Sequence, residues 1–164
     1  MQTFIVAVAD WLVFPIALLA AAVLLWRVPN KHKIVVYSRL LMAGLTSYLV
    51  AKLMALAYQP SSLRPFEIAG VEPGASYLDN PGFPSDHALF VWVIVFAVVY
   101  VLGRTWLTLF LAVAAAVVSV GRVLALVHAP IDVVGGFLAA IIGAAWYVTS
   151  YAKLDKKNLQ KVEK

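Results

Sequence analysis

Two short polar segments in an otherwise apolar chain carry side chains that could bind and cleave a phosphate ester. The first covers residues 83–87 and reads Phe-Pro-Ser-Asp-His, and the second covers residues 121–132 and reads Gly-Arg-Val-Leu-Ala-Leu-Val-His-Ala-Pro-Ile-Asp. Ionisable side chains are costly inside a membrane, so they usually mark a functional site. With Arg64 upstream, these segments supply groups that could hold a phosphate, attack it and protonate its leaving group.

His128 and Asp132 are one helical turn apart, and Pro130 between them suits the first turn of a helix. Such an aspartate can accept a hydrogen bond from one imidazole nitrogen and leave the other nitrogen free to act as a nucleophile. A purely structural alternative is a histidine at the membrane interface beside an aspartate that complements the helix dipole. His87 and the nearby cations favour the functional interpretation.

Ser85 is expected to cap a helix whose first turn holds Asp86 and His87. A helix start presents unpaired N–H groups, which bind anions, and the Ser85 hydroxyl could add a donor. The alternative is that Ser85 only caps the helix and Asp86 only complements its dipole.

Arg122 lies in an apolar segment, about 9 Å of helical rise before His128. Arginine suits a planar partner with several oxygens, so an anion ligand is the functional interpretation. The alternative is that Arg122 extends to the membrane surface, and this alternative is stronger for Lys52, whose flexible stem can do the same.

The composition indicates a membrane protein. Of its 164 residues, 63% are hydrophobic and 13% are charged, so the apolar surface exceeds what one soluble domain could bury. The chain has no cysteine, which excludes disulfides, thiolate catalysis and cysteine-ligated metals. Its net charge of +5 does not indicate nucleic-acid binding, because the charges lie at the ends of the apolar segments.

We expect an all-α integral membrane bundle of about five transmembrane helices, forming a single domain over residues 1–164 with a flexible basic tail at 153–164. The expected spans are Phe4–Trp26, Ile34–Tyr58, Ala88–Leu102, Trp106–Val127 and Ile131–Tyr151. The first is expected to be a retained helix and not a signal peptide, because its apolar run is too long. Gly135, Gly136 and Gly143 are expected to let helices pack closely.

The basic residues predict the orientation of these spans. Ten of the thirteen lysines and arginines fall on one side, which the positive-inside rule places in the cytoplasm. The N-terminus is then outside and the C-terminus inside. The remaining three (Lys52, Arg64 and Arg122) gather on the outer side near the long, turn-rich connection at residues 59–84, where a short helix around 62–69 is possible.

These residues resemble the motifs of the type 2 phosphatidic acid phosphatase superfamily, in its membrane branch of lipid phosphate phosphatases. That family has a lysine followed by Arg-Pro, then Pro-Ser-Gly-His, then Ser-Arg, five residues, His, three residues and Asp. Here the third motif has Gly121 in place of Ser, and the second has Asp86 in place of Gly. In the first motif Lys52 precedes Arg64-Pro65 by twelve positions, which is longer than the usual spacing. The sequence of residues 83–88 resembles the corresponding segment of the undecaprenyl-diphosphate phosphatases.

The resemblance implies a lipid phosphatase without cofactor or metal, acting on a bilayer lipid at the outer face of the cell membrane. His128 would be the nucleophile, Asp132 its orienting group and His87 the general acid. The phosphate would be bound by Arg122, Arg64, Ser85 and Lys52, with Asp86 tuning the site. Undecaprenyl diphosphate is the first substrate expected, with phosphatidylglycerol phosphate or phosphatidic acid as alternatives. A small transporter or proton-conducting protein, a metal site at the histidines, and the oligomeric state all stay open.

Overall fold

The structure is a computed structural model that describes residues 5–58, 63–80 and 82–148, and every regular element in these residues is helical. The expected tail at 153–164 and the extreme ends of the first and last expected spans lie outside the described residues. The elements, in chain order, are η1 (Ala7–Trp11), α2 (Val13–Arg27), η2 (Asn30–His32), α3 (Lys33–Ala57), α4 (Pro65–Ala69), α5 (Asp86–Leu102), α6 (Trp106–Leu124) and α7 (Pro130–Gly143).

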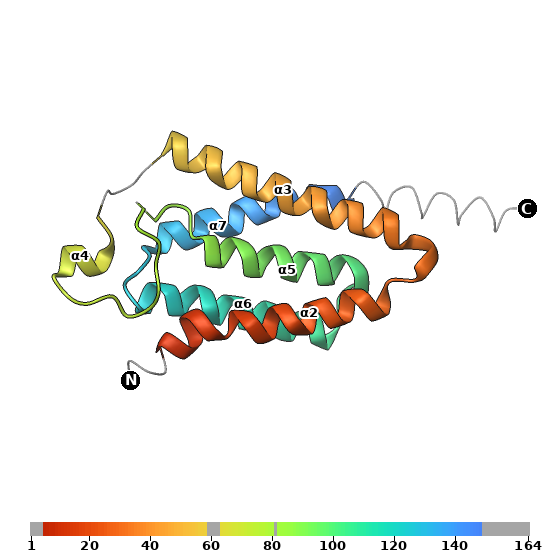
Figure 1. Cartoon of the computed structure of the whole chain (residues 1–164), viewed down its shortest axis with the longest axis horizontal. Coiled ribbons are helices and arrows are strands. Elements are labelled where there is room, and N and C mark those ends of the chain that lie inside the picture. Colours follow the sequence, from red (N-terminus) through yellow and green to blue (C-terminus); the bar gives the residue numbers. More distant parts are fainter. Residues whose placement is uncertain (1–4, 59–62, 81, 149–164) are drawn as a thin grey trace, which may run out of the picture.

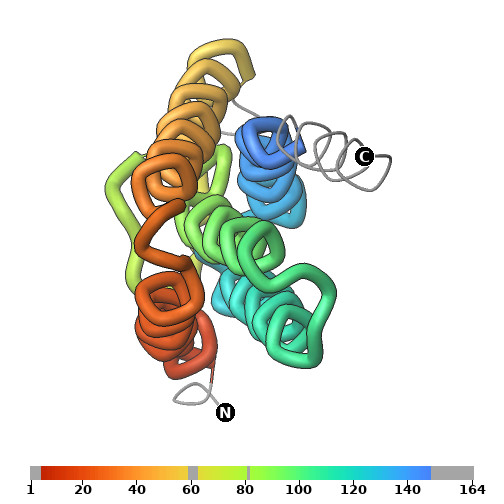
Figure 2. The backbone as a smooth tube through the Cα atoms, turned by 90° about the vertical axis from the view of Figure 1, so that its right-hand side faces the viewer, coloured from red at the N-terminus to blue at the C-terminus, as the bar shows by residue number. Residues whose placement is uncertain are grey.

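The long helices run side by side, and α5 lies in the middle of them (Figures 1 and 2). It packs against α2, α3, α6 and α7. This central place fits its sequence, because branched residues such as Val91, Val95 and Val98 are almost fully buried. They form a core with Leu111 and Val118 of α6 and with apolar residues of α2.

Four helical segments are long and apolar enough to cross a membrane: Ala7–Arg27, Asn30–Ala57, Trp106–Leu124 and Pro130–Val148. The fifth apolar helix, α5, has 17 residues and begins at Asp86, directly after the expected N-cap Ser85. All five expected apolar segments are therefore helical, and four of them meet the length that a bilayer requires.

The fourth expected span is shorter than predicted. We expected helix through Val127, but α6 ends at Leu124 and the chain turns at Leu126, which has a φ of 57°. Carbonyl groups of this turn accept hydrogen bonds from the outer connection: Ala125 from the Gly74 N–H and Leu126 from the Phe66 N–H, each at 3.0 Å. The turn thus places His128 beside the end of α6 and ties it to the loop above.

Glycines bring α7 close to its neighbours, as the sequence predicts. A Cβ on Gly135 would lie 2.6 Å from the Phe83 ring, and one on Gly136 would lie 2.5 Å from the Ser85 carbonyl oxygen. A Cβ on Gly143 would collide with Ser47 and with the α3 backbone. Any larger residue would therefore force α7 away from α3 and α5.

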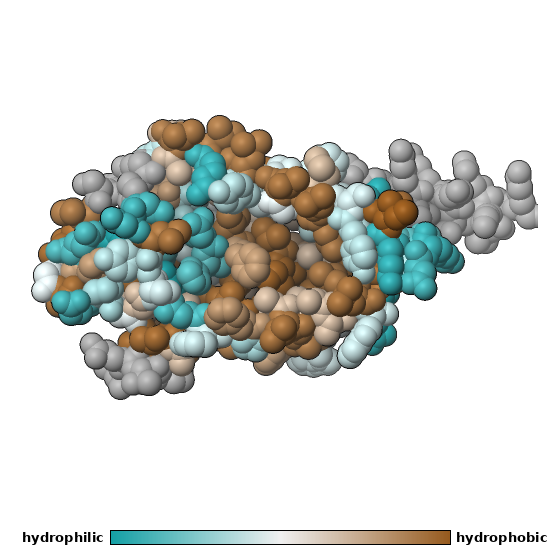
Figure 3. Space-filling model, in the orientation of Figure 1, coloured by the Kyte–Doolittle hydropathy of each residue, from teal (hydrophilic) through white to brown (hydrophobic). Residues whose placement is uncertain are grey.

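The surface is polar at the two ends and apolar between them (Figure 3). Large apolar side chains such as Leu18, Ile34 and Leu56 are more than two-thirds exposed. An apolar surface of this extent is typical of lipid-facing helices. One polar end contains the connection between α3 and α5, and η1 begins at the same end (Figure 1). This connection includes the short helix α4, which confirms the expected helix around 62–69 in a shorter form.

Candidate active site

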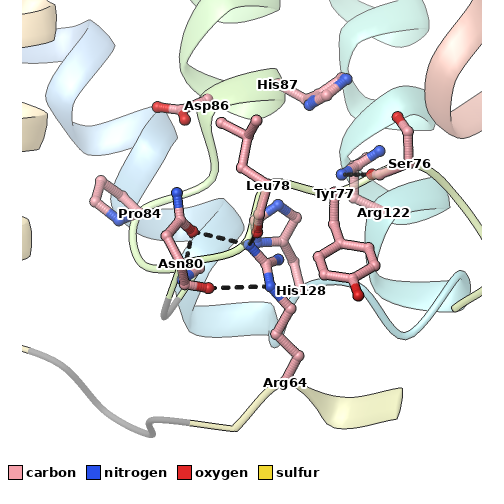
Figure 4. Close-up of a pocket in the computed structure, with 11 residues that line it drawn as sticks. Arg64, Ser76, Tyr77, Leu78, Asn80, Pro84, Asp86, His87, Arg122 and His128 are labelled. Atoms are coloured by element: carbon pink, nitrogen blue, oxygen red, sulfur yellow. Dashed lines mark hydrogen bonds between the residues drawn. The ribbon is translucent and has the colours of Figure 1, made fainter. Parts of the chain in front are cut away.

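The polar end with α4 contains a cavity of about 200 Å³ where the two predicted segments meet. Its wall comes from the outer connection, the first turn of α5, the last turn of α6 and the chain just before α7 (Figure 4). The lining residues are Arg64, Ser76, Tyr77, Leu78, Asn80, Gly82, Pro84, Asp86, His87, Arg122 and His128. The structure thus brings five predicted site residues to one cavity: Arg64, Asp86, His87, Arg122 and His128.

His128 and Asp132 form the predicted pair. Nδ1 of His128 lies 3.3 Å from Oδ2 of Asp132, and both side chains are about 95% buried. The same carboxylate oxygen accepts a hydrogen bond of 2.8 Å from the Ala129 N–H, so the start of α7 holds it in place. A carboxylate at Nδ1 favours the tautomer with the proton on Nδ1, which leaves Nε2 with its lone pair free.

Burial lowers the pKa of His128 below its ordinary value of 6.5, and the nearby Arg122 and Arg64 act in the same direction. The hydrogen bond to Asp132 and its negative charge oppose this shift. The imidazole is consequently neutral near neutral pH, which is the form that can act as a nucleophile.

Arg122 is 1% exposed although it carries a charge. Its Nη1 donates to Oδ1 of Asp10 at 2.6 Å, and its Nη2 donates to the Ser76 carbonyl at 2.6 Å. Within the described part of the chain, its Nε–H is buried without a hydrogen-bond partner. A buried donor without a partner costs free energy, which an oxygen of a bound anion could recover.

Arg64 organises the loop around the cavity. Its Nε donates to the Asn80 carbonyl at 3.2 Å, its Nη2 donates to the Leu78 carbonyl and to Asn80 Oδ1 at 2.8 Å each, and its Nη1 donates to the Val127 carbonyl. A guanidinium has five N–H groups, so these four bonds leave one on Nη1 for another acceptor. Burial lowers the pKa of Arg64, with Asp132 and Glu67 opposing that shift, yet an arginine stays charged at physiological pH.

The N-cap and first turn of α5 carry three of the predicted residues: Ser85, Asp86 and His87. Ser85 is the N-cap, as expected: it is fully buried and its Oγ accepts from the Ala88 N–H at 3.5 Å. Ser85 and Asp132 do not line the cavity, although the Ser85 N–H donates to the Asp132 carbonyl at 2.8 Å. Asp86 and His87 do line it and point apart (Figure 4). No ion pair joins Asp86 to a cation in residues 5–58, 63–80 and 82–148.

Lys52 lies outside this cavity, in the wall of a neighbouring one of about 170 Å³. The two cavities share Asn80, Gly82, Pro84 and Asp86 as lining residues. The Lys52 ammonium lies 5.0 Å from the centre of the Tyr48 ring, one turn earlier in α3. Lys52 and Arg64, whose spacing in the sequence is longer than in the family's motif, therefore line different cavities.

Sequence reasoning missed Asp10 and Asn80. Asp10 binds both Arg122 and the Ser76 N–H, and Asn80 Oδ1 accepts from Arg64 and from the Gly82 N–H. Asp10 was detectable in principle, since an acidic residue in an apolar segment requires a partner. Asn80 lies among turn-forming residues, and no feature of the sequence separates it from them.

The cavity therefore holds a neutral histidine oriented by a buried carboxylate, a second histidine, and two arginines. Nucleophilic catalysis on an anionic group requires such a set, because the arginines neutralise the charge that the nucleophile must approach. No group of three His, Cys, Asp or Glu side chains in the described residues is arranged to bind a metal.

Comparison with known proteins agrees with this chemistry. A sequence model of the PAP2 superfamily matches residues 32–156, which includes every predicted site residue from Lys52 to Asp132 and excludes Asp10. No curated protein and no solved structure gives a significant match. Members of this superfamily are phosphatases, and since the match covers most of the chain, the chain belongs to the PAP2 superfamily.

Proposed function

We propose that this protein is an integral membrane lipid phosphatase that works through a phosphohistidine intermediate. The observation that carries the proposal is that His128, which is paired with the buried Asp132, lines one cavity together with Arg122. The family supports phosphoester hydrolysis, and the apolar helices suit a substrate that resides in a bilayer.

In the first step, Nε2 of His128 attacks phosphorus in line with the leaving oxygen. The N–P bond forms, and the P–O bond to the leaving group breaks; this group is the lipid alcohol of a monophosphate or the lipid phosphate of a diphosphate. His87 donates its proton to the departing oxygen. Asp132 keeps the imidazole in position and stabilises the positive charge that it acquires.

In the second step, His87, now neutral, takes a proton from a water molecule that attacks the phosphohistidine. The new P–O bond forms, the N–P bond breaks, and inorganic phosphate leaves with His128 restored. Both steps pass through a transition state with charge spread over three equatorial oxygens. Arg122, through its free Nε–H, and Arg64, through its remaining N–H, stabilise that charge.

Ser85 contributes by capping α5, which orients the N–H groups of the first turn toward an anion. Asp86 tunes the charge of the site from the wall that both cavities share. Full activity of an Asp86→Gly variant at every pH would contradict a tuning role.

A diphosphate head group is the substrate that best fits the two adjoining cavities. The first is smaller than the roughly 300 Å³ at which pockets for drug-sized ligands begin, so it suits a single phosphoryl group. The second would take the phosphate next to the lipid, with the Lys52 ammonium beside it. We therefore place undecaprenyl diphosphate first, and phosphatidylglycerol phosphate and phosphatidic acid after it.

The reaction is proposed to need no metal, because arginines line the cavity and would repel a divalent cation. We also place the site at the outer face of the membrane. Arg27, Lys31, Lys33 and Arg104 lie at the opposite end of the bundle, and short loops rich in such residues stay in the cytoplasm.

Phosphate release from a panel of lipids, measured with purified protein in detergent and in EDTA, tests the proposal. We expect release from undecaprenyl diphosphate to exceed release from the two glycerolipids, and His128→Ala or Arg122→Ala to abolish it while the protein still inserts and folds. Release that requires a divalent metal, or that survives both substitutions, would contradict the mechanism. Ion transport by protein that releases no phosphate would favour the transporter alternative, which the clustering of ionisable groups at one end disfavours.

A further inference from the structure

Asp10 joins three separate parts of the chain at the edge of the cavity. Its Oδ1 accepts from Arg122 Nη1 at 2.6 Å, and its Oδ2 accepts from the Ser76 N–H at 2.8 Å. The Ser76 carbonyl in turn accepts from Arg122 Nη2 at 2.6 Å. These three bonds form a closed cluster, here called the Asp10 cluster, of Asp10, Ser76 and Arg122.

Gly121 makes this cluster possible. A Cβ at position 121 would lie 2.9 Å from Cγ1 of Val8 and 3.4 Å from the backbone of Ala9, which is fully buried. The π-helical turn η1 therefore packs directly on the α6 backbone, one residue before Arg122. A side chain at position 121, such as the serine of the family's pattern, would therefore crowd the turn that carries Asp10.

We propose that Asp10 is a positioning residue that fixes the Arg122 guanidinium for phosphoryl transfer, and this rests on the proposed function. Arginine side chains are flexible, and a buried charge without a counter-ion is unstable. Asp10 supplies the counter-ion before substrate binds and takes one N–H of Nη1, while Ser76 takes one N–H of Nη2. The Nε–H and the second N–H of each Nη are left for phosphoryl oxygens, and a guanidinium that is already fixed in place provides the form of electrostatic stabilisation that lowers barriers most.

This role lies outside the family's motifs. Asp10 precedes the matched region at residues 32–156, so the match to the family does not include it. Its side chain is 17% exposed, and it meets Arg122 without reaching the catalytic pair of His128 and Asp132.

Asp10→Asn is the direct test. An amide has one acceptor oxygen, yet the two oxygens of Asp10 each face a donor, so one bond must be lost. Because the affected charge develops chiefly in the transition state, we expect kcat to fall about ten- to a hundredfold and KM to change by less than about threefold. Asp10→Glu restores the charge and should recover part of the loss. Glu72→Gln, which removes one exposed carboxylate from the same outer connection, should leave both constants unchanged.

Gly121→Ala and Val8→Ala provide a second test that keeps the carboxylate. The new methyl group should push η1 away from Arg122 and lower kcat as Asp10→Asn does. Adding Val8→Ala removes the nearest atom and should restore most of the activity. This pair decides the question if Asp10→Asn fails to fold.

Nitrogen-15 spectra of the arginine side chains separate this inference from the proposed function, since they need no activity. A guanidinium held by two acceptors gives resolved Nη signals, and we expect those of Arg122 to merge in Asp10→Asn. Unchanged Arg122 signals would overturn the inference even if the wild type releases phosphate. A KM lowered by more than about threefold in Asp10→Asn would also overturn it, because Asp10 would then be competing with the phosphate. If the wild type releases no phosphate while the Arg122 signals respond as expected, the proposed function fails and the positioning of Arg122 stands.

Discussion

At the scale of single residues, the site depends on charges that are buried and held by neighbours. Arg122 is 1% exposed, and His128, Asp132 and Arg64 are each about 95% buried. Electrostatic interactions are stronger in such a setting than in water, so a small change in one partner alters the others. Substitutions here should change pH dependence and substrate preference as well as rate.

The first prediction concerns pH. Burial lowers the pKa of His128, and a lowered pKa means that the neutral nucleophile persists to lower pH. The acid limb of kcat/KM should therefore have its midpoint below 6.5. Asp132 raises the His128 pKa, so Asp132→Asn should shift the limb further down while lowering kcat about 10²–10⁴-fold.

The pKa of the His128 ring can be measured by nuclear magnetic resonance in the absence of substrate. Substrate is left out because its own phosphate titrates at about pH 6. An upward shift of the ring pKa in Asp132→Asn would show that another group governs it. The His32 ring, exposed at the far end of the bundle, provides the internal control, because its signal should be the same in both proteins.

The second prediction concerns Lys52. If the adjoining cavity binds the second phosphate, Lys52→Met should raise KM for a diphosphate lipid about tenfold or more and leave that for a monophosphate lipid nearly unchanged. Arg104→Met removes a cation from the opposite end and should affect neither substrate. Equal losses on both lipids would mean that Lys52 serves the transferred phosphate instead.

At the scale of helices, the sequence predicts the existence of the elements better than their ends. Five apolar runs were predictable because a bilayer needs about 20 such residues per helix. The end of α6 was not predictable, because leucine is not a turn-forming residue and rarely adopts a positive φ such as the 57° of Leu126. The His128–Asp132 pair followed from spacing alone, whereas the contact of Asp10 with Arg122 joins residues 112 positions apart.

The third prediction tests the close packing of α5 and α7. A Cβ on Gly136 would lie 2.5 Å from the Ser85 carbonyl oxygen and 2.9 Å from the Leu89 nitrogen, and backbone atoms cannot move aside singly. Gly136→Ala should therefore separate the helices and lengthen the 2.8 Å bond between the Ser85 N–H and the Asp132 carbonyl. We expect about 1–3 kcal/mol of destabilisation together with a loss of phosphate release.

Gly44→Ala is the matched control, because a Cβ there meets nothing within 4 Å. Alanine favours helix over glycine by up to about 1 kcal/mol, so this variant should be as stable as the wild type or more so. Unfolding in detergent measures both. Similar losses in the two variants would indicate a general intolerance of helix substitutions and not a specific contact.

At the scale of the whole molecule, function depends on two unlike ends. One end carries the cavity, α4 and the turn-rich connection, and the other carries the α2–α3 and α5–α6 turns, with the apolar surface between them (Figures 1 and 3). Arg27, Lys31, Lys33 and Arg104 lie at the second end. Under the proposed function, a head group bound at the first end can keep its lipid chain beside the apolar band, so cleavage need not remove the substrate from the bilayer.

The fourth prediction fixes which end faces outward. The chain has no cysteine, so single cysteines can be labelled without background. Glu72 is exposed at the cavity end and Asn30 at the other, and replacing either leaves the basic residues that set orientation untouched. A maleimide that cannot cross membranes should label Glu72→Cys in intact cells and Asn30→Cys only after permeabilisation. The reverse pattern would place the site in the cytoplasm, where it would act on lipids of the inner leaflet, and labelling of the unsubstituted protein would invalidate the assay.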